Sequence, residues 1–364
     1  MTPLVVVDAD VLGRRRTGDE TYVRNLLREL APLAGERGIR LAAVSRNREL
    51  VPSGVEAHAL GTRSQELRMS LSLPRLLRHV GASLCHTQYA VPLRSPCPCV
   101  VTVHDLSFVR EPALMGRRDR LVFRAIVPRA VRRAARVLTV SERTKRDLVE
   151  LYGVPVEKIV VTPNGVDPAF SPSPPIEPRD NLSQALHTRA SAAEDPRDNL
   201  SQGSYALAVG AIQRRKNQLA ALEAATAAGL RLVVAGPEKD PALATELRRS
   251  GAQVEGYVET ERLAELYRRA ACLVQASRYE GFGLPVLEAM ASGTPVVAVR
   301  EPALEEVAGD AAVFVDEDEL ADGIRRAIAD RERLVAAGLE RSRVFSWRAT
   351  AERTLAVYRE ILDA

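Results

Sequence analysis

The sequence is poor in the features that mark secreted, membrane-spanning and metal-binding proteins. Its 364 residues include only four cysteines, Cys85, Cys97, Cys99 and Cys272. The Cys97-Pro-Cys99 step lacks the spacing of a zinc pair or of a redox Cys-x-x-Cys motif. We therefore expect reduced cysteines, which are typical of the cytosol. No apolar run approaches the length that spans a bilayer. These absences predict a cytoplasmic protein without a metal site.

Charge of one sign is also scarce, since the formal net charge is only +4. Such a small excess gives no reason to expect a nucleic-acid partner. The segment from Met1 to Asp8 reads directly as a strand, without a basic region or a cleavage site, so we predict no signal peptide. The length suits two domains better than one core.

Short apolar strands alternate with helical stretches in both halves of the chain, which predicts parallel sheets covered by helices on both faces. The first half has expected strands at 4–7, 41–44, 83–86, 100–103, 137–140 and 159–161, and helices at 22–33, 66–79, 119–135 and 141–152. The second half has expected strands at 205–209, 230–235, 272–275, 295–299 and 312–315, and helices at 218–228, 241–250, 260–269, 285–291, 317–329 and 347–362.

The composition changes between the two halves. Residues 171–203 are rich in Pro, Ser, Asp, Arg and Asn, and the heptapeptide Pro-Arg-Asp-Asn-Leu-Ser-Gln at 178–184 recurs at 196–202. Two copies are too few for a repeat fold. We interpret the segment as an interdomain linker that a local duplication has lengthened.

One loop combines groups that suit phosphate and groups that suit sugar. Glu280 follows an apolar strand, and Glu288 stands in the first turn of the next helix. Gly281 and Gly283 between them let the backbone approach a ligand closely. Free N–H groups at a helix start attract phosphate, and carboxylates accept hydrogen bonds from sugar hydroxyls. The loop therefore suits a nucleotide-sugar, although a solvated acid at a helix start is the plainer alternative.

The string EGFGLPVLEAMASGTPVV, which begins at Glu280, closely resembles the Glu-x7-Glu signature of family 4 of the retaining glycosyltransferases. The resemblance covers nearly the whole chain except the linker. It implies an α/β protein of GT-B architecture, with two Rossmann-like doubly wound domains that face a central cleft. The implied parts are an acceptor-side domain at 1–168, a linker at 169–204, a nucleotide-sugar domain at 205–345, and a helix at 346–364 that crosses back to the first domain.

A basic element lies between a strand and a helix, at Arg214, Arg215 and Lys216. Cations at a helix start are unfavourable by about 0.3–1 kcal/mol each, and a bound diphosphate would reverse that sign. An exposed basic loop is the alternative. By resemblance, Arg215 and Lys216 match the family element that contacts the donor diphosphate, whereas Ala211 departs from it.

Further donor-site residues follow from the resemblance. His104 comes just after a buried strand, at the sheet edge that faces ligands in open α/β folds, and the matching family histidine lies beside the donor sugar. Gly18 matches a glycine-bearing loop near the donor phosphates, although a plain βα turn is the alternative. Tyr257 and Val258 match the stretch that lines the base pocket.

The resemblance implies transfer of a hexose, with mannose as the first choice, from a nucleotide diphosphate sugar to a glycan, lipid-linked or small-molecule acceptor. The anomeric configuration would be retained by front-face attack, without a metal ion or cofactor. Lys216, Arg215 and the amides of Phe282 to Leu284 would stabilise the departing diphosphate. Glu280 would hold the donor sugar, and Glu288 the ribose.

Two other functions stay open at this point. A nucleotide-sugar epimerase of the same architecture would convert the donor without an acceptor, and a non-catalytic subunit would only bind it. The complete Glu280–Glu288 pair and the Arg215-Lys216 element disfavour the second. An NAD oxidoreductase is disfavoured because no Gly-x-Gly-x-x-Gly fingerprint is present.

A basic stretch in the first half suggests an additional partner. Residues 117–136 hold eight arginines and one acidic residue among apolar positions. Such a helix could dock on an anionic membrane that carries a lipid-linked acceptor. We expect Pro128 to interrupt the helix, and an ordinary exposed helix is the alternative.

Overall fold

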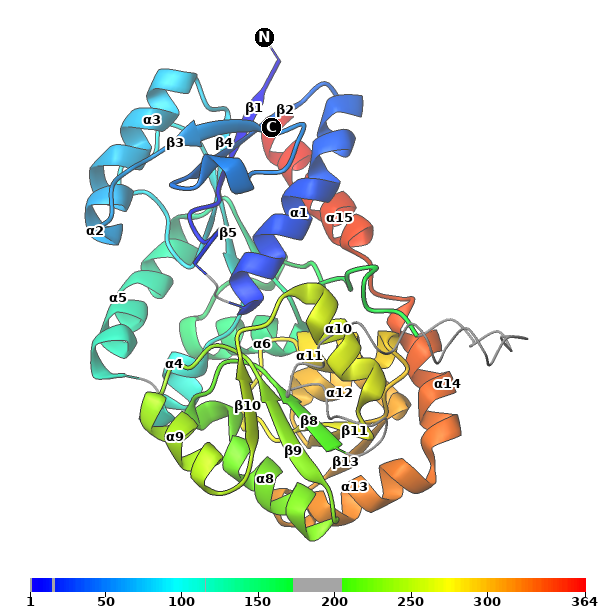
Figure 1. The fold of residues 1–364 in the computed structure, drawn as a ribbon. Helices are drawn as coiled ribbons and strands as arrows, with labels where there is room; N and C mark the ends of the chain where they lie inside the picture. The colour runs from blue at the N-terminus through cyan, green and yellow to red at the C-terminus, as the bar shows by residue number, and fades with distance from the viewer. Residues whose placement is uncertain (1, 15–16, 115, 173–204) are drawn as a thin grey trace, which may run out of the picture.

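The computed structural model describes residues 2–14, 17–114, 116–172 and 205–364. Two parallel sheets organise these residues (Figure 1). The first has the strand order β3-β2-β1-β4-β5-β6-β7, and the second has the order β10-β9-β8-β11-β12-β13. Each order reverses direction beside the first strand of its domain, which is the doubly wound topology. The predicted fold class is therefore confirmed.

The first domain contains the strands β1 (Leu4–Asp8), β2 (Arg40–Ser45), β3 (Glu56–Ala59), β4 (Leu84–Gln88), β5 (Cys99–Val103), β6 (Arg136–Thr139) and β7 (Ile159–Val161). Its helices include α1 (Thr17–Glu36), α2 (Gln65–Leu67), the π-helix η2 (Arg68–Ser72), α3 (Leu73–Val80), α4 (Ser107–Arg110), α5 (Arg117–Arg133) and α6 (Glu142–Tyr152).

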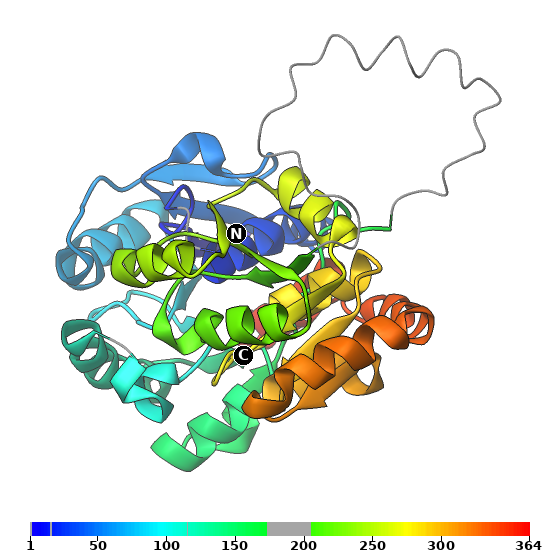
Figure 2. The same cartoon turned by 60° about the horizontal axis from the view of Figure 1, so that its bottom comes forward.

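The second domain contains β8 (Tyr205–Val209), β9 (Arg231–Ala235), β10 (Gln253–Gly256), β11 (Cys272–Gln275), β12 (Val296–Val299) and β13 (Ala312–Val315). Its helices include the 3-10 helix η6 (Arg214–Lys216), α8 (Gln218–Ala227), α9 (Pro241–Arg249), α10 (Thr260–Arg269), α11 (Leu284–Ala291), α12 (Pro302–Ala308), α13 (Leu320–Ala329) and α14 (Arg331–Ser342). The last helix is α15 (Trp347–Leu362). Helices α13 and α14, in orange, lie on the opposite side of the molecule from α2 and α3, in light blue (Figure 2).

The last helix packs on the first domain. α15 lies alongside α1 (Figure 1). The hydroxyl of Tyr358 lies 2.5 Å from Nδ1 of the buried His86, and Nε2 of His86 lies 2.7 Å from the Thr102 hydroxyl. This buried chain of polar contacts fixes α15 against strands β4 and β5.

The prediction that Pro128 interrupts its helix is wrong, because α5 continues through this residue. Val127, Ala130 and Val131 around it are buried, and their packing offsets the roughly 3 kcal/mol that an interior proline costs a helix. Among the described residues, no helix is both long and apolar enough to cross a bilayer. The duplicated heptapeptide at 178–184 and 196–202 lies outside the described residues.

Candidate active site

An ion cluster in the second domain joins three residues predicted for the donor site. Nζ of Lys216 lies 2.5 Å from Oε1 of Glu280, and Nη1 of Arg215 lies 3.4 Å from Oε2. Gln275, at the end of β11, donates a hydrogen bond of 2.6 Å to Oε1. The loop after β11 and the short helix η6 after β8 thus bring their charged side chains together at the carboxyl ends of neighbouring strands.

Glu280 is buried, with only 6% of it exposed, whereas Lys216 and Arg215 are half-buried. Burial alone would raise the pKa of Glu280, but the charges of Lys216 and Arg215 outweigh it and lower the pKa to about 2. Burial lowers the pKa of Lys216, and the charge of Glu280 opposes that shift. The carboxylate is therefore ionised throughout the physiological range.

The expectation that three cations crowd this helix start needs correction. The side chain of Arg214 is 78% exposed and lies outside the cluster, 4.0 Å from Asp240. Arg215 and Lys216 already have a protein carboxylate as partner, because Glu280, in the loop after β11, lies beside them. Glu280 therefore offsets the repulsion between Arg215 and Lys216, and the two cations can lie together without a ligand.

The Glu280 loop touches the first domain through backbone. A Cβ added at Gly281 would lie 2.1 Å from the carbonyl oxygen of His104, so only glycine permits this approach. The hydroxyl of Ser141 donates a hydrogen bond of 2.6 Å to the Gly281 carbonyl. The loop after β5, which carries His104, and the loop after β11 consequently form one junction between the domains.

His104 stands at this junction as a buried imidazole. The ring of Tyr22 packs edge-on with centroids 4.7 Å apart, and the ring of Tyr89 lies 5.6 Å away. Burial lowers the pKa of His104, although the charges of Asp19 and Asp105 oppose the shift. Nε2 is buried and has no hydrogen-bond partner among the described residues. A buried polar atom of this kind is ready for a ligand group.

Glu288 has a different environment from Glu280. It lies in α11, where the Tyr267 hydroxyl donates a hydrogen bond of 2.8 Å to Oε2. Burial, with a smaller contribution from the charge of Asp167, raises the pKa of Glu288 to about 7. No direct hydrogen bond joins the two glutamates within the described part of the chain.

The remaining predicted donor residues surround these groups. The Phe282 side chain is buried, with its ring edge-on to Phe345 at 5.8 Å, so only its backbone can face a ligand. Gly283 has φ +109° and immediately precedes α11, whose first residue, Leu284, is half-buried. Tyr257 and Val258 follow β10 and are half-buried.

Gly18 differs from its expected place in a loop. Helix α1 begins at Thr17, five residues earlier than predicted, with Asp19 and Glu20 in its first turn. Acidic residues there favour an early helix start. Gly18 is exposed, and an added Cβ would have nothing within 4 Å. The charge of Asp19 acts on His104, so this first turn lies on the His104 side of the junction.

Two residues of the junction escaped the sequence analysis. Tyr279 donates a hydrogen bond of 2.7 Å to the buried Asp147, and Gln275 supports Glu280. The position of Gln275 at a strand end next to the motif is a usable signal. Nothing in the sequence pairs Tyr279 with Asp147, because the two residues belong to different domains.

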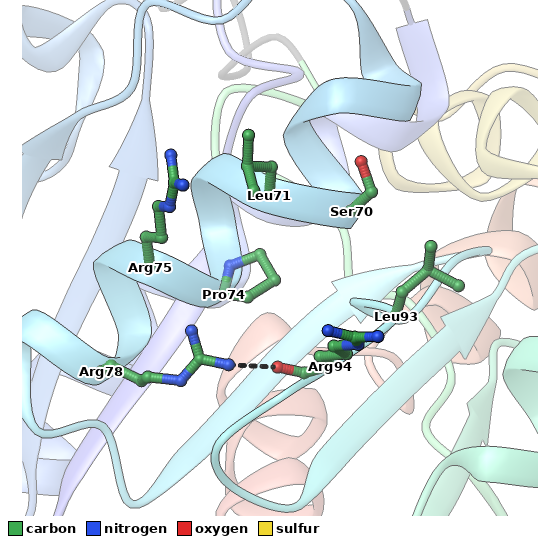
Figure 3. Close-up of a pocket in the computed structure, with 7 residues that line it drawn as sticks. All are labelled: Ser70, Leu71, Pro74, Arg75, Arg78, Leu93 and Arg94. Atoms are coloured by element: carbon green, nitrogen blue, oxygen red, sulfur yellow. Dashed lines mark hydrogen bonds between the residues drawn. The ribbon is translucent and has the colours of Figure 1, made fainter.

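Two surface cavities lie away from these residues. A cavity of about 430 Å³ opens beside η2 and α3 (Figure 3), and a neighbouring one of about 360 Å³ contains Cys97 and Arg133. The first is lined by Ser70, Leu71, Pro74, Arg75, Arg78, Leu93 and Arg94. Neither cavity contains a predicted site residue. Among the described residues, no group of histidine, cysteine and carboxylate side chains could hold a metal ion.

Two family models match the chain. The model described as "Glycosyltransferase Family 4" matches residues 16–170, and the model described as "Glycosyl transferases group 1" matches residues 193–341. The first match covers most of the domain that carries His104. The second covers the part of the chain that carries Lys216, Glu280 and Glu288.

Relatives and solved structures agree with these matches. The chain is 29% identical to O-antigen chain mannosyltransferase B of Escherichia coli, over 71% of this chain and 70% of the relative. It is 29% identical to a D-inositol 3-phosphate glycosyltransferase of Thermomonospora curvata, over 97% and 94%. The fold is similar to that of Anabaena Alr3699/HepE solved with UDP-glucose, with a TM-score of 0.72, 14% identity, and coverage of 98% of this chain and 99% of the other.

Proposed function

This chain belongs to the family 4 glycosyltransferases of the GT-B fold, and on that premise we propose that it transfers a hexose, with retention, from a nucleoside diphosphate sugar. The donor would bind at the junction between the two domains. The observation that carries this proposal is the ion cluster of the buried Glu280 with Lys216 and Arg215, held beside the start of α11.

The cluster suits a diphosphate with an attached sugar. Lys216 has three N–H donors and uses one on Glu280, while Arg215 presents a planar fork. At the start of α11 Pro285 has no N–H group, and the N–H groups of Val286 and Leu287 donate to the Gly283 carbonyl. The amides of Phe282 to Leu284 would therefore be the ones that donate to an anion at this helix start. Glu280 stays ionised beside these donors, so its carboxylate can accept hydrogen bonds from sugar hydroxyls.

These groups would accelerate loss of the leaving group. Cleavage of the bond between the anomeric carbon and the phosphate oxygen places negative charge on the diphosphate. Lys216, Arg215 and the amides of Phe282 to Leu284 would stabilise that charge, a contribution that is often the largest in enzymes. The departing phosphate takes the acceptor proton on the same face, so no carboxylate serves as a nucleophile. The cationic side chains make a metal ion or cofactor unnecessary in this scheme.

His104 and Glu288 would orient the two ends of the donor. The unpaired Nε2 of His104 would hold a hydroxyl of the transferred sugar. Glu288 would accept hydrogen bonds from the ribose, with the base against Tyr257 and Val258. Gly18, exposed in the first turn of α1, would leave room for the phosphates on the opposite side of the junction.

The relatives point to two acceptor classes. One is named for an O-antigen chain and mannose transfer, and the other for an inositol phosphate. We favour mannose as the sugar and a glycan or lipid-linked glycan as the acceptor. An inositol phosphate is the second candidate, because the alignment with that relative covers nearly the full length of both chains.

Contact with an anionic membrane belongs to the same proposal, together with a cytoplasmic location. Helix α5 exposes Leu121 and Val122 as well as Arg124 and Arg129. Apolar and basic side chains on one helix suit an anionic interface. Sedimentation with anionic and with neutral vesicles tests this contact. The contact is supported if the protein sediments with the anionic vesicles and Arg124→Glu weakens this binding. It is contradicted if equal amounts of protein sediment with both vesicle types.

A donor panel followed by a transfer assay tests the function. Thermal shifts with GDP-, UDP- and ADP-sugars identify the donor, because a ligand at 100 times its dissociation constant stabilises by about 2.7 kcal/mol. Proton NMR of donor with glycan and inositol phosphate acceptors then reports product and anomeric configuration. Transfer with retention supports the proposal. Inversion, or conversion of the donor to an isomer without an acceptor, contradicts it.

A further inference from the structure

We propose that Tyr279 is a positioning residue, which anchors the Glu280 loop to the first domain and so sets the distance between Glu280 and His104. This inference rests on the proposed function. Tyr279 immediately precedes Glu280 and is only 2% exposed. Its hydroxyl donates a hydrogen bond of 2.7 Å to Oδ2 of Asp147 and accepts one of 3.1 Å from the N–H of Leu106.

The acceptor of this hydrogen bond, Asp147, is held by other groups of the first domain. Asp147 lies in α6, is fully buried, and accepts hydrogen bonds from Arg110 at 2.7 Å and from Arg143 at 3.1 Å. The Arg143 guanidinium also lies over the Tyr279 ring, 5.2 Å from its centroid. The carboxylate of Asp147 is therefore held in place by contacts other than the one with Tyr279.

The second partner connects Tyr279 to the proposed sugar site. Leu106 follows His104 by two residues, so its N–H ties the tyrosine to the His104 loop. On the other side, the Tyr279 carbonyl accepts a hydrogen bond from Arg215, whose guanidinium also contacts Glu280. One residue thus bonds with its side chain to the first domain and with its backbone to the ion cluster of the second.

Neighbouring contacts strengthen the same junction. Glu306, from the second domain, accepts a hydrogen bond of 2.9 Å from the N–H of Glu142, at the start of α6. Figure 1 shows α6 beside α12, the helix that carries Glu306. Because these contacts hold the domains together independently, loss of the Tyr279 hydroxyl should shift the Glu280 loop without separating the domains.

The expected effect is on turnover rather than on donor binding. A displacement of about 1 Å can cost about 100-fold in rate. The groups proposed to hold the nucleotide, Lys216 and Glu288, both lie in the second domain. We therefore expect Tyr279→Phe to lower kcat about 10- to 100-fold and to change the dissociation constant of the free nucleotide less than threefold.

Tyr205→Phe is a matched control. Tyr205 is also buried in the second domain, and its hydroxyl donates one hydrogen bond of 2.7 Å to the carbonyl of Leu266. Tyr205→Phe also removes a buried hydroxyl, but this hydroxyl contacts none of the proposed site residues. The experiment measures kcat, donor KM, nucleotide affinity and thermal unfolding for both variants, with amide hydrogen exchange at Leu106 in addition.

The inference is supported if only Tyr279→Phe loses turnover, keeps nucleotide affinity, and exchanges the Leu106 amide faster. It is overturned if Tyr279→Phe keeps the wild-type kcat, or if both variants lose turnover equally. A wild-type protein that transfers no sugar overturns the proposed function instead. Unchanged Leu106 exchange in Tyr279→Phe would then still refute the anchor.

Discussion

The ammonium group of Lys216 lies 2.5 Å from the carboxylate of the buried Glu280, although the two residues are 64 positions apart along the chain. Because Arg215 also faces the carboxylate, the cluster has a net positive charge of one in the absence of ligand. A diphosphate would meet cationic groups that are already oriented, which is the condition for electrostatic stabilisation of a transition state.

Lys216→Ala and Glu280→Gln should each cost about 2–4 kcal/mol of transition-state stabilisation, or about 30- to 1000-fold in kcat/KM. The lysine variant loses the charge that faces the leaving group, and the glutamine variant loses the anion that holds the sugar. Steady-state kinetics measure both.

Arg214→Ala is the control for the lysine variant, because Arg214 is adjacent in the sequence but exposed and outside the cluster. Its kcat/KM should stay within about twofold of the wild type, since surface ion pairs contribute little. Equal losses in the Arg214 and Lys216 variants would mean that only the general positive charge of η6 matters.

Donor affinity should rise with pH between 6 and 8. The pKa of Glu288 is raised to about 7, chiefly by burial, so its ionised fraction, which accepts hydrogen bonds from ribose, increases through this range. We expect the dissociation constant of the nucleotide-sugar to fall by up to about tenfold. Titration calorimetry at each pH measures it.

Glu288→Gln should abolish this pH dependence. Glu301 is a useful comparison, because burial also raises its pKa to about 7, yet it caps α12 by accepting hydrogen bonds from Ala303 and Leu304. A pH dependence that persists in Glu288→Gln but vanishes in Glu301→Gln would show that Glu301 titrates instead, and would contradict this prediction.

Gly281→Ala should inactivate the enzyme. The new methyl group would meet the His104 carbonyl at 2.1 Å, and relief of such a clash typically costs about 1–3 kcal/mol. Gly35→Ala, in helix α1 with nothing within 4 Å, should instead leave activity intact and raise the free energy of unfolding by up to about 1 kcal/mol. Wild-type turnover in Gly281→Ala would show that the junction is not needed in this form.

Acid should destabilise the protein through His86. Burial, with a contribution from the charge of His104, lowers its pKa to about 3. The unfolded chain takes up a proton near pH 6.5 while the folded chain does not, so stability falls as the pH drops below about 6.5, by about 1.4 kcal/mol per pH unit. Urea unfolding at pH 7.5, 6 and 5 should show this slope, and His86→Asn should reduce it. An unchanged slope in His86→Asn would contradict the assignment.

The sequence analysis was most successful where a continuous apolar run marks a strand. Strands at 205–209, 272–275 and 312–315 were predicted with their observed bounds for this reason. The edge strand β3, Glu-Ala-His-Ala, was missed since its residues are only half-buried or exposed. Helices α12 and α14 were also missed.

The sequence predicted those site residues that belong to a recognisable motif, but not the contacts between them. Glu280 and Lys216 were assigned to one site by resemblance, whereas their direct ion pair, the junction at Gly281 and the Tyr279 anchor join segments that are distant along the chain. Tertiary packing sets these contacts, and no local pattern encodes them. The pKa difference between Glu280 and Glu288 also depends on partners that the loops bring together in the fold.

Calorimetric titration of the donor found in the panel into wild type, Lys216→Ala and Arg214→Ala tests most directly whether the cluster of Lys216, Arg215 and Glu280 binds the diphosphate. We predict that the dissociation constant rises at least about tenfold for Lys216→Ala, equivalent to about 1.4 kcal/mol, and less than twofold for Arg214→Ala. Equal dissociation constants in wild type and Lys216→Ala would contradict the account.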